Sequence, residues 1–91
     1  MSPPGEATFM AAWAWRGPDD DAALGDLIAR ERALLGEWAR RGVLLHRSIA
    51  ADETRGWLVL RCADEPAALA LLDALPLRRW LEFSLTLLAQ S

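Results

Sequence analysis

The segment that decides the fold lies near the end of the chain and reads Asp73-Ala-Leu-Pro-Leu-Arg-Arg-Trp-Leu-Glu-Phe-Ser-Leu-Thr-Leu-Leu-Ala89. Leucines recur at the spacing of a helix face up to Leu75, and Pro76 biases Leu75 away from the helical conformation. From residue 82 to residue 87, polar and apolar side chains alternate, which is typical of a half-buried strand. The segment therefore predicts a helix end, a break at Pro76 and a C-terminal strand.

The rest of the chain divides into elements of the same kinds. A strand is predicted over residues 8–16, and a helix then runs from the acidic residues 19–21, which can cap it, to about Arg41. Gly42 is the expected left-handed stop of this helix. Strands over residues 43–51 and 57–62 form a hairpin around a turn at 52–56, and Asp64 caps a second helix with Pro66 in its first turn. The apolar stripe of the first helix is predicted to be Leu24, Leu27, Ile28, Leu34, Leu35 and Trp38.

The order strand, helix, strand, strand, helix, strand predicts an α+β fold of the ferredoxin-like type. Such a fold has one four-stranded antiparallel sheet with both helices on one face. We expect residues 1–7 to form a flexible tail and residues 8–91 a single domain. Because the helices cover only one face, the other face of the sheet is open to solvent or to a second subunit.

The composition excludes several classes of function. The 91 residues contain ten arginines and no lysine, so catalysis through a lysine Schiff base is excluded. One histidine and one cysteine, Cys62, argue against a metal site within one chain, and we expect neither a metal nor a cofactor. The net charge of −3 argues against nucleic acid, and no apolar run is long enough to span a membrane. A single thiol, expected to be a buried small hydrophobe, and an N-terminus without signal-peptide features favour the cytoplasm.

The open face of the predicted sheet carries both apolar and polar side chains. It should present Arg16 at the end of the first strand, Glu82 and Ser84 on the last strand, and His46 and Ser48 on the second. The remaining residues expected on this face are Met10, Ala12, Ala14 and Thr86, while Phe83, Leu85 and Leu87 should face the helices. A mixed face of this kind predicts a homodimer or higher homo-oligomer with a pocket for a small-molecule substrate. Arg16, Ser48, Glu82 and Ser84 are the substrate-binding candidates on it.

Two residues are candidates for proton transfer. Glu31 falls on the apolar stripe of the first helix, where lost hydration raises the pKa of a carboxyl and suits it to act as a general base. A structural alternative is a glutamate paired with Arg47 or Arg61. His46 is the only histidine, and imidazole is a common proton shuttle near neutral pH, although a hydrogen-bonded structural histidine is the alternative.

Five tryptophans and an arginine pair complete the candidates. Trp80 is expected to line a pocket for a planar ligand. Arg78, next to Arg79, is a candidate clamp for a carboxylate, with a solvated loop or a subunit salt bridge as the alternatives. The other tryptophans are expected in the core: Trp13, Trp15, Trp38 and Trp57.

The order of elements and the run Leu75-Pro76-Leu77 together resemble the muconolactone delta-isomerase family, over residues 9–88. The resemblance implies a small ferredoxin-like protein that associates through its sheets as a dimeric α+β barrel. It also implies a double-bond shift by proton transfer without a cofactor. His46 falls at a histidine position of the family. The chain departs from the family at Arg78-Arg79-Trp80, which replaces Phe-Pro-Tyr, and at Ala12 and Arg16, where the family carries lysine.

These observations lead to one functional hypothesis and two alternatives. The leading hypothesis is a cofactor-independent isomerase, or a related tailoring enzyme, acting on an unsaturated or aromatic-derived metabolite. In this hypothesis Glu31 and His46 remove and return the proton, and Arg16 or Arg78 binds an anionic group of the substrate. The first alternative is a cofactor-free oxygenase or cyclase of the dimeric α+β barrel group. The second is a non-catalytic module that binds a ligand or forms an oligomer.

Overall fold

The strands of the chain form one antiparallel sheet of four strands in the order β2-β3-β1-β4. The computed structural model describes residues 6–18 and 24–89. The elements are β1 Ala7–Trp15, α1 Leu24–Arg40, β2 Leu44–Ile49, β3 Arg55–Cys62, α2 Glu65–Asp73, the 3-10 turn η1 Arg78–Trp80, and β4 Leu81–Leu87. This order and topology confirm the predicted ferredoxin-like α+β fold.

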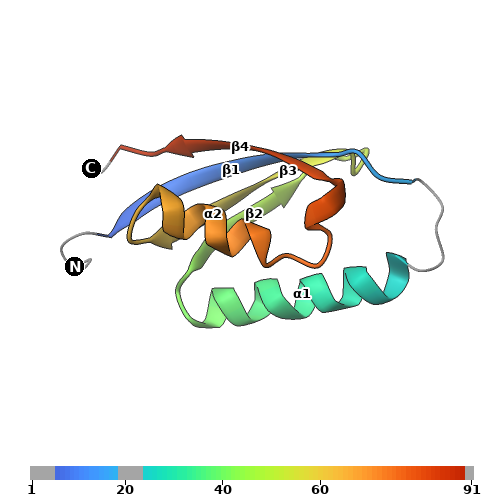
Figure 1. Cartoon of the computed structure of the whole chain (residues 1–91), viewed down its shortest axis with the longest axis horizontal. Helices are drawn as coiled ribbons and strands as arrows, with labels where there is room; N and C mark the ends of the chain where they lie inside the picture. Colours follow the sequence, from blue (N-terminus) through green and yellow to red (C-terminus); the bar gives the residue numbers. More distant parts are fainter. Residues whose placement is uncertain (1–5, 19–23, 90–91) are drawn as a thin grey trace.

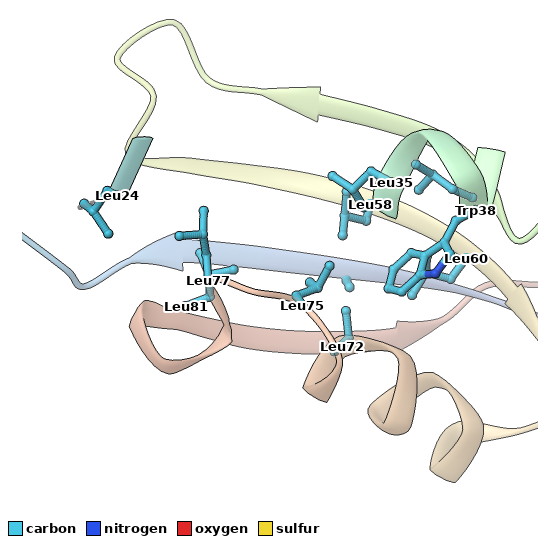
Figure 2. Close-up of a cluster of buried hydrophobic side chains, with 11 residues drawn as sticks. Leu24, Leu35, Trp38, Leu58, Leu60, Leu72, Leu75, Leu77 and Leu81 are labelled. Atoms are coloured by element: carbon cyan, nitrogen blue, oxygen red, sulfur yellow. The ribbon is translucent and has the colours of Figure 1, made fainter. Parts of the chain in front are cut away.

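Both helices of the described residues lie on the same side of the sheet, and these residues place no helix on the other side (Figure 1). We call the first side the covered face and the second the open face. The core fills the space between the covered face and the helices, and Figure 2 shows its leucines, from α1, β3, α2, the segment after α2 and β4, with Trp38 at one end of the cluster. Its buried residues are Ala11, Leu24, Leu35, Trp38, Leu44, Leu58, Leu60, Leu72, Leu75, Leu77 and Leu81.

The predicted helix signals have direct structural counterparts. Gly42 adopts a φ of 77°, and the N–H groups of Gly42 and Val43 donate to the carbonyl oxygens of Ala39 and Trp38, which is a Schellman ending. Asp64 accepts a hydrogen bond from the N–H of Ala67 at 2.9 Å and so caps α2 as expected. The predicted caps of α1 at residues 19–21 lie outside the described residues.

Several predicted boundaries move by a few residues. Strand β1 already includes Ala7, which the sequence assigned to the tail, and β2 ends at Ile49, two residues early. Strand β3 begins at Arg55, so the turn is shorter than expected. Gly56 reads as a turn residue but pairs with Trp13, whose indole would lie 2.5 Å from any Cβ at that position. Glycine is therefore needed here for the close approach of a ring.

One position of the predicted apolar stripe is wrong. Ile28 of α1 is 37% exposed, because the helix rests on the sheet along a narrower stripe than its apolar spacing suggests. Leu69 of α2 is likewise 46% exposed. Cys62 is half-buried, with its Sγ 3.6 Å from the carbonyl oxygen of Asp64. Among the described residues, no helix is long and apolar enough to cross a membrane.

Candidate functional site

The strand register decides which side chains share the open face. Ala12 of β1 stands opposite Trp57 of β3 and Ser84 of β4. Ala14, two residues on, stands opposite Arg55 and Glu82 in the same way. Because residues directly opposite in antiparallel strands point to the same side, all of these belong to one face. The opposite set from β1, which includes the buried Phe9 and Ala11, faces the helices.

Strand β2 adds His46 and Ser48 to the open face. His46 pairs with Val59 and Ser48 with Trp57, although an irregularity between Leu44 and His46 shifts the register. The imidazole Nε2 of His46 and the hydroxyl Oγ of Ser48 share a hydrogen bond of 2.7 Å. Both side chains are exposed, so this pair is a solvated feature of the open face.

A shallow hollow of about 260 Å³ lies over the centre of the open face. The side chains around it include Trp57 and Ser84, and the guanidinium of Arg55 sits 5.9 Å from the centre of the Trp57 ring. Trp57 was predicted to be core, and this is wrong because its register places it opposite Ala12 on the open face. Along β3, Arg55 and Trp57 occupy the positions that alternate with those of the buried Leu58 and Leu60. The two-residue period of a strand could therefore have placed Arg55 and Trp57 on the open face from the sequence.

Arg16 and Glu82 close one end of the same face as an ion pair. The Nε of Arg16 lies 2.8 Å from Oε2 of Glu82. The two side chains are 64% and 66% exposed, so solvent screens their attraction. The four substrate-binding candidates that were predicted on the open face all lie on it: Arg16, Ser48, Glu82 and Ser84. Two of them, Arg16 and Glu82, bind one another.

Glu31 belongs to α1 on the covered side, and its carboxylate contacts the segment after α2. Its Oε1 accepts a hydrogen bond of 3.3 Å from the backbone N–H of Leu77, and the carboxylate is half-buried. Burial raises the pKa of Glu31 above its ordinary value of 4.5, and the Leu77 N–H lowers it by a smaller amount. None of the ion pairs among the described residues involves Glu31, so the structural alternative of a pairing with Arg47 or Arg61 is not found there. Within the part of the chain that the structure describes, Glu31 is thus a carboxylate without a charged partner, in a poorly hydrated position.

Two tryptophans, Trp80 and Trp15, lie near Leu77, whose N–H binds the carboxylate of Glu31. Trp80 donates its backbone N–H to the carbonyl oxygen of Leu77 at 3.0 Å, and its ring centre is 6.0 Å from that of Trp15. The backbone N–H of Arg16 donates to the Trp80 carbonyl oxygen at 2.7 Å, which fixes the end of β1 against η1. Both indoles are half-buried against the core. The covered side therefore combines one carboxylate with an aromatic wall.

Arg78 is held at three points close to Glu31's partner Leu77. Its Nε lies 3.1 Å from Oδ1 of Asp73, its Nη1 donates to the carbonyl oxygen of Leu81 at 2.7 Å, and its guanidinium lies 5.2 Å from the centre of the Phe83 ring. Two of its nitrogens are thus already engaged within the chain.

The candidate residues consequently separate into two groups on opposite faces. Glu31, Arg78 and Trp80 lie on the covered side, while His46 and the other candidates lie on the open face. The chain does not bring Glu31 and His46 together. Within the described residues, no cluster of three His, Cys, Asp or Glu side chains is arranged to hold a metal ion.

Comparisons with known proteins found one matching family and similar solved structures. The model of the muconolactone delta-isomerase family matches residues 9–91. A crystal structure of muconolactone isomerase superposes with a TM-score of 0.80 at 22% identity, covering 92% of this chain and 90% of that chain, and confirms the fold. A mutant of SnoaB, a cofactor-independent oxygenase from Streptomyces nogalater, matches with a TM-score of 0.47 at 20% identity over 96% of both chains. No curated protein matches the chain.

Proposed function

The chain belongs to the muconolactone delta-isomerase family, and from this premise we propose that it is a cofactor-independent isomerase. It would shift a double bond within a small unsaturated metabolite by moving one proton. The family and the enzyme in the matching crystal structure are both named after muconolactone, so muconolactone is the first substrate to test.

The observation that supports this proposal is the isolated carboxylate of Glu31. A base that removes a proton from carbon works best when its pKa is closer to neutrality than that of a free glutamate, and burial shifts Glu31 in that direction. With no cation beside it among the described residues, the carboxylate keeps its basicity. The Leu77 N–H holds one oxygen and leaves the other available.

The proposed reaction uses no other reagent. The Glu31 carboxylate takes a proton from a carbon next to the carbonyl system, and the electron pair of that C–H bond enters the conjugated system as a dienolate. The Glu31 carboxylic acid, whose proton exchanges with solvent, then donates a proton to a different carbon, and the double bond takes its new position. Atoms and charge balance, and the half-buried rings of Trp15 and Trp80, tilted by 42° to one another, supply apolar surface for the unsaturated intermediate.

The test is proton exchange followed by NMR. The full chain is incubated in D2O with muconolactone and with other small unsaturated lactones, and deuterium incorporation and product formation are measured. We expect Glu31→Gln to lower both by about 10²-fold or more, the scale of general-base catalysis. The glutamine retains an oxygen that accepts the Leu77 N–H, so the fold should persist. Glu37→Gln, on an exposed part of the same helix, is the matched control.

Three results would redirect the proposal. Full activity in Glu31→Gln together with loss in His46→Gln would move the chemistry to the open face. Turnover only with oxygen present, measured by oxygen uptake, would favour a cofactor-free oxygenase. Tight binding of a lactone without exchange or turnover would favour a ligand-binding module.

A further inference from the structure

The segment that carries Leu77 is spanned by one side-chain bridge. Asp73 ends α2 and Leu81 begins β4, so these two residues flank the junction 74–80. Arg78 binds both of them, through Nε to the Asp73 carboxylate at 3.1 Å and through Nη1 to the Leu81 carbonyl oxygen at 2.7 Å. A guanidinium is a rigid planar group, so two contacts on different nitrogens set both its place and its orientation.

Inside this bridge, the backbone N–H of Leu77 donates to a side chain outside the junction. Arg78 donates its N–H to Leu75 and Trp80 donates to Leu77, each at 3.0 Å, which closes the short turns of the junction. The N–H of Leu77 instead donates to Oε1 of Glu31. The position of this N–H therefore depends on the conformation of the junction, which the Arg78 bridge spans.

We propose that Arg78 and Asp73 are positioning residues, which fix the junction so that the Leu77 N–H orients the carboxylate of Glu31. Arg78 then acts on the reaction through Leu77 and does not hold the substrate. This inference rests on the proposed role of Glu31 as the base. Its structural half, the coupling of Arg78 to Glu31, can be measured without any substrate.

The first measurement is the titration of the Glu31 carboxyl by carbon-13 NMR in the full chain. The Leu77 N–H stabilises the ionised form of Glu31, so a loosened junction raises the pKa of Glu31. Arg78→Met keeps an unbranched chain over Phe83 but removes both polar contacts, and we expect it to raise this pKa. Arg79→Met, an exposed neighbour, is the matched control and should leave the titration unchanged.

A second variant separates positioning from simple charge. Removing the negative charge of Asp73 lowers the pKa of any nearby carboxyl by electrostatics alone. Loss of the bridge, in contrast, raises the pKa of Glu31. Asp73→Ala is therefore expected to raise it if the proposal holds, and a lowered value overturns the proposal. Burial and the Leu77 N–H are the causes of the present shift, and no charged side chain is among them.

Kinetics distinguish positioning from substrate binding. We expect Arg78→Met to lower kcat about tenfold, the scale of a slightly misplaced catalytic group, with KM near the wild-type value. Arg78→Lys should recover part of kcat, because it keeps a cation near Asp73, and it serves as the second variant if Arg78→Met fails to fold. A raised KM with unchanged kcat overturns the proposal in favour of a substrate clamp, as does an unchanged Glu31 titration in Arg78→Met. If Glu31→Gln is fully active, the proposed function fails, while the titrations still decide the coupling of Arg78 to Glu31.

Discussion

The two faces of the sheet treat polar side chains in opposite ways. On the open face, polar groups are exposed and bind one another, as in the Arg16–Glu82 ion pair and the His46–Ser48 hydrogen bond. On the covered side, Glu31 is half-buried, and its one partner among residues 6–18 and 24–89 is a backbone N–H. Exposed pairs are solvated and contribute little energy, whereas an isolated half-buried carboxylate changes its chemistry.

This contrast separates the two candidates for proton transfer by their surroundings. A histidine next to a serine looks more like catalytic machinery than a single glutamate does. Its position on an exposed strand, however, gives it no low-polarity environment, while the helix packing gives one to Glu31. Perturbed groups in partly buried positions are the better markers of chemistry.

The largest expected effect separates the two faces at neighbouring residues of β3. Leu60 on the covered face is 0% exposed, and Leu60→Ala should lower the free energy of unfolding by about 2–5 kcal/mol, since it leaves a cavity in the core. Val59 points to the open face and is half-exposed, so Val59→Ala should cost about 1 kcal/mol. Urea unfolding of the two variants measures both values.

The contrast between the two faces fails if Leu60→Ala and Val59→Ala lower the free energy of unfolding by similar amounts. A cost for Val59→Ala close to that for Leu60→Ala, together with a dependence of stability on protein concentration, would mean that a second copy covers the open face in solution. The predicted association through this face would then be the reason. A small and concentration-independent cost would leave the open face solvated.

A smaller effect concerns the pH dependence of stability. Because burial raises the pKa of Glu31 above 4.5, ionisation of this group opposes folding. Its favourable contribution is complete below the unfolded pKa and is lost as the pH rises through the folded pKa. We therefore expect Glu31→Gln to gain stability relative to the wild type as the pH rises from below 4.5 to 7, measured by urea unfolding at each pH.

Asp52 provides a control of opposite sign. The backbone N–H and then the hydroxyl of Thr54 lower the pKa of Asp52 below 3.8, so its stabilising contribution is present above 3.8 and is lost at lower pH. Asp52→Asn should thus lose stability relative to the wild type as the pH rises toward 3.8. Equal slopes for the two variants would contradict the assigned environment of Glu31.

Local patterns in the sequence were sufficient for most of the fold. The alternation in β4, the Gly42 stop and the Asp64 cap all depend on near neighbours, and each was confirmed. The 3-10 turn at residues 78–80 was not predicted, and the contacts of its Arg78 side chain with Asp73 and Leu81 follow no local sequence pattern. Boundaries near Gly56 also shifted, since only the packed Trp13 ring explains a glycine within a strand.

The candidate site was predictable only in part. The apolar stripe of α1 correctly suggested a poorly hydrated Glu31, but its partner Leu77 lies 46 residues away, and no local pattern carries that information. Trp57 was assigned to the core because tryptophan is usually buried, whereas the strand register places it on the open face. Which side a strand residue faces depends on pairing, and pairing is a property of the whole sheet.

The smallest expected effect tests whether the open face is solvated. A double-mutant cycle with Arg16→Gln and Glu82→Gln should give a coupling of about 0.2–1 kcal/mol, because both side chains are largely exposed and the pair is screened by solvent. The coupling should fall further in high salt, since surface charges are then screened within a few ångströms. A coupling of several kcal/mol that resists salt would require the pair to be shielded from water. Such a result would place a partner over the open face and would remove the contrast between the two sides of the sheet.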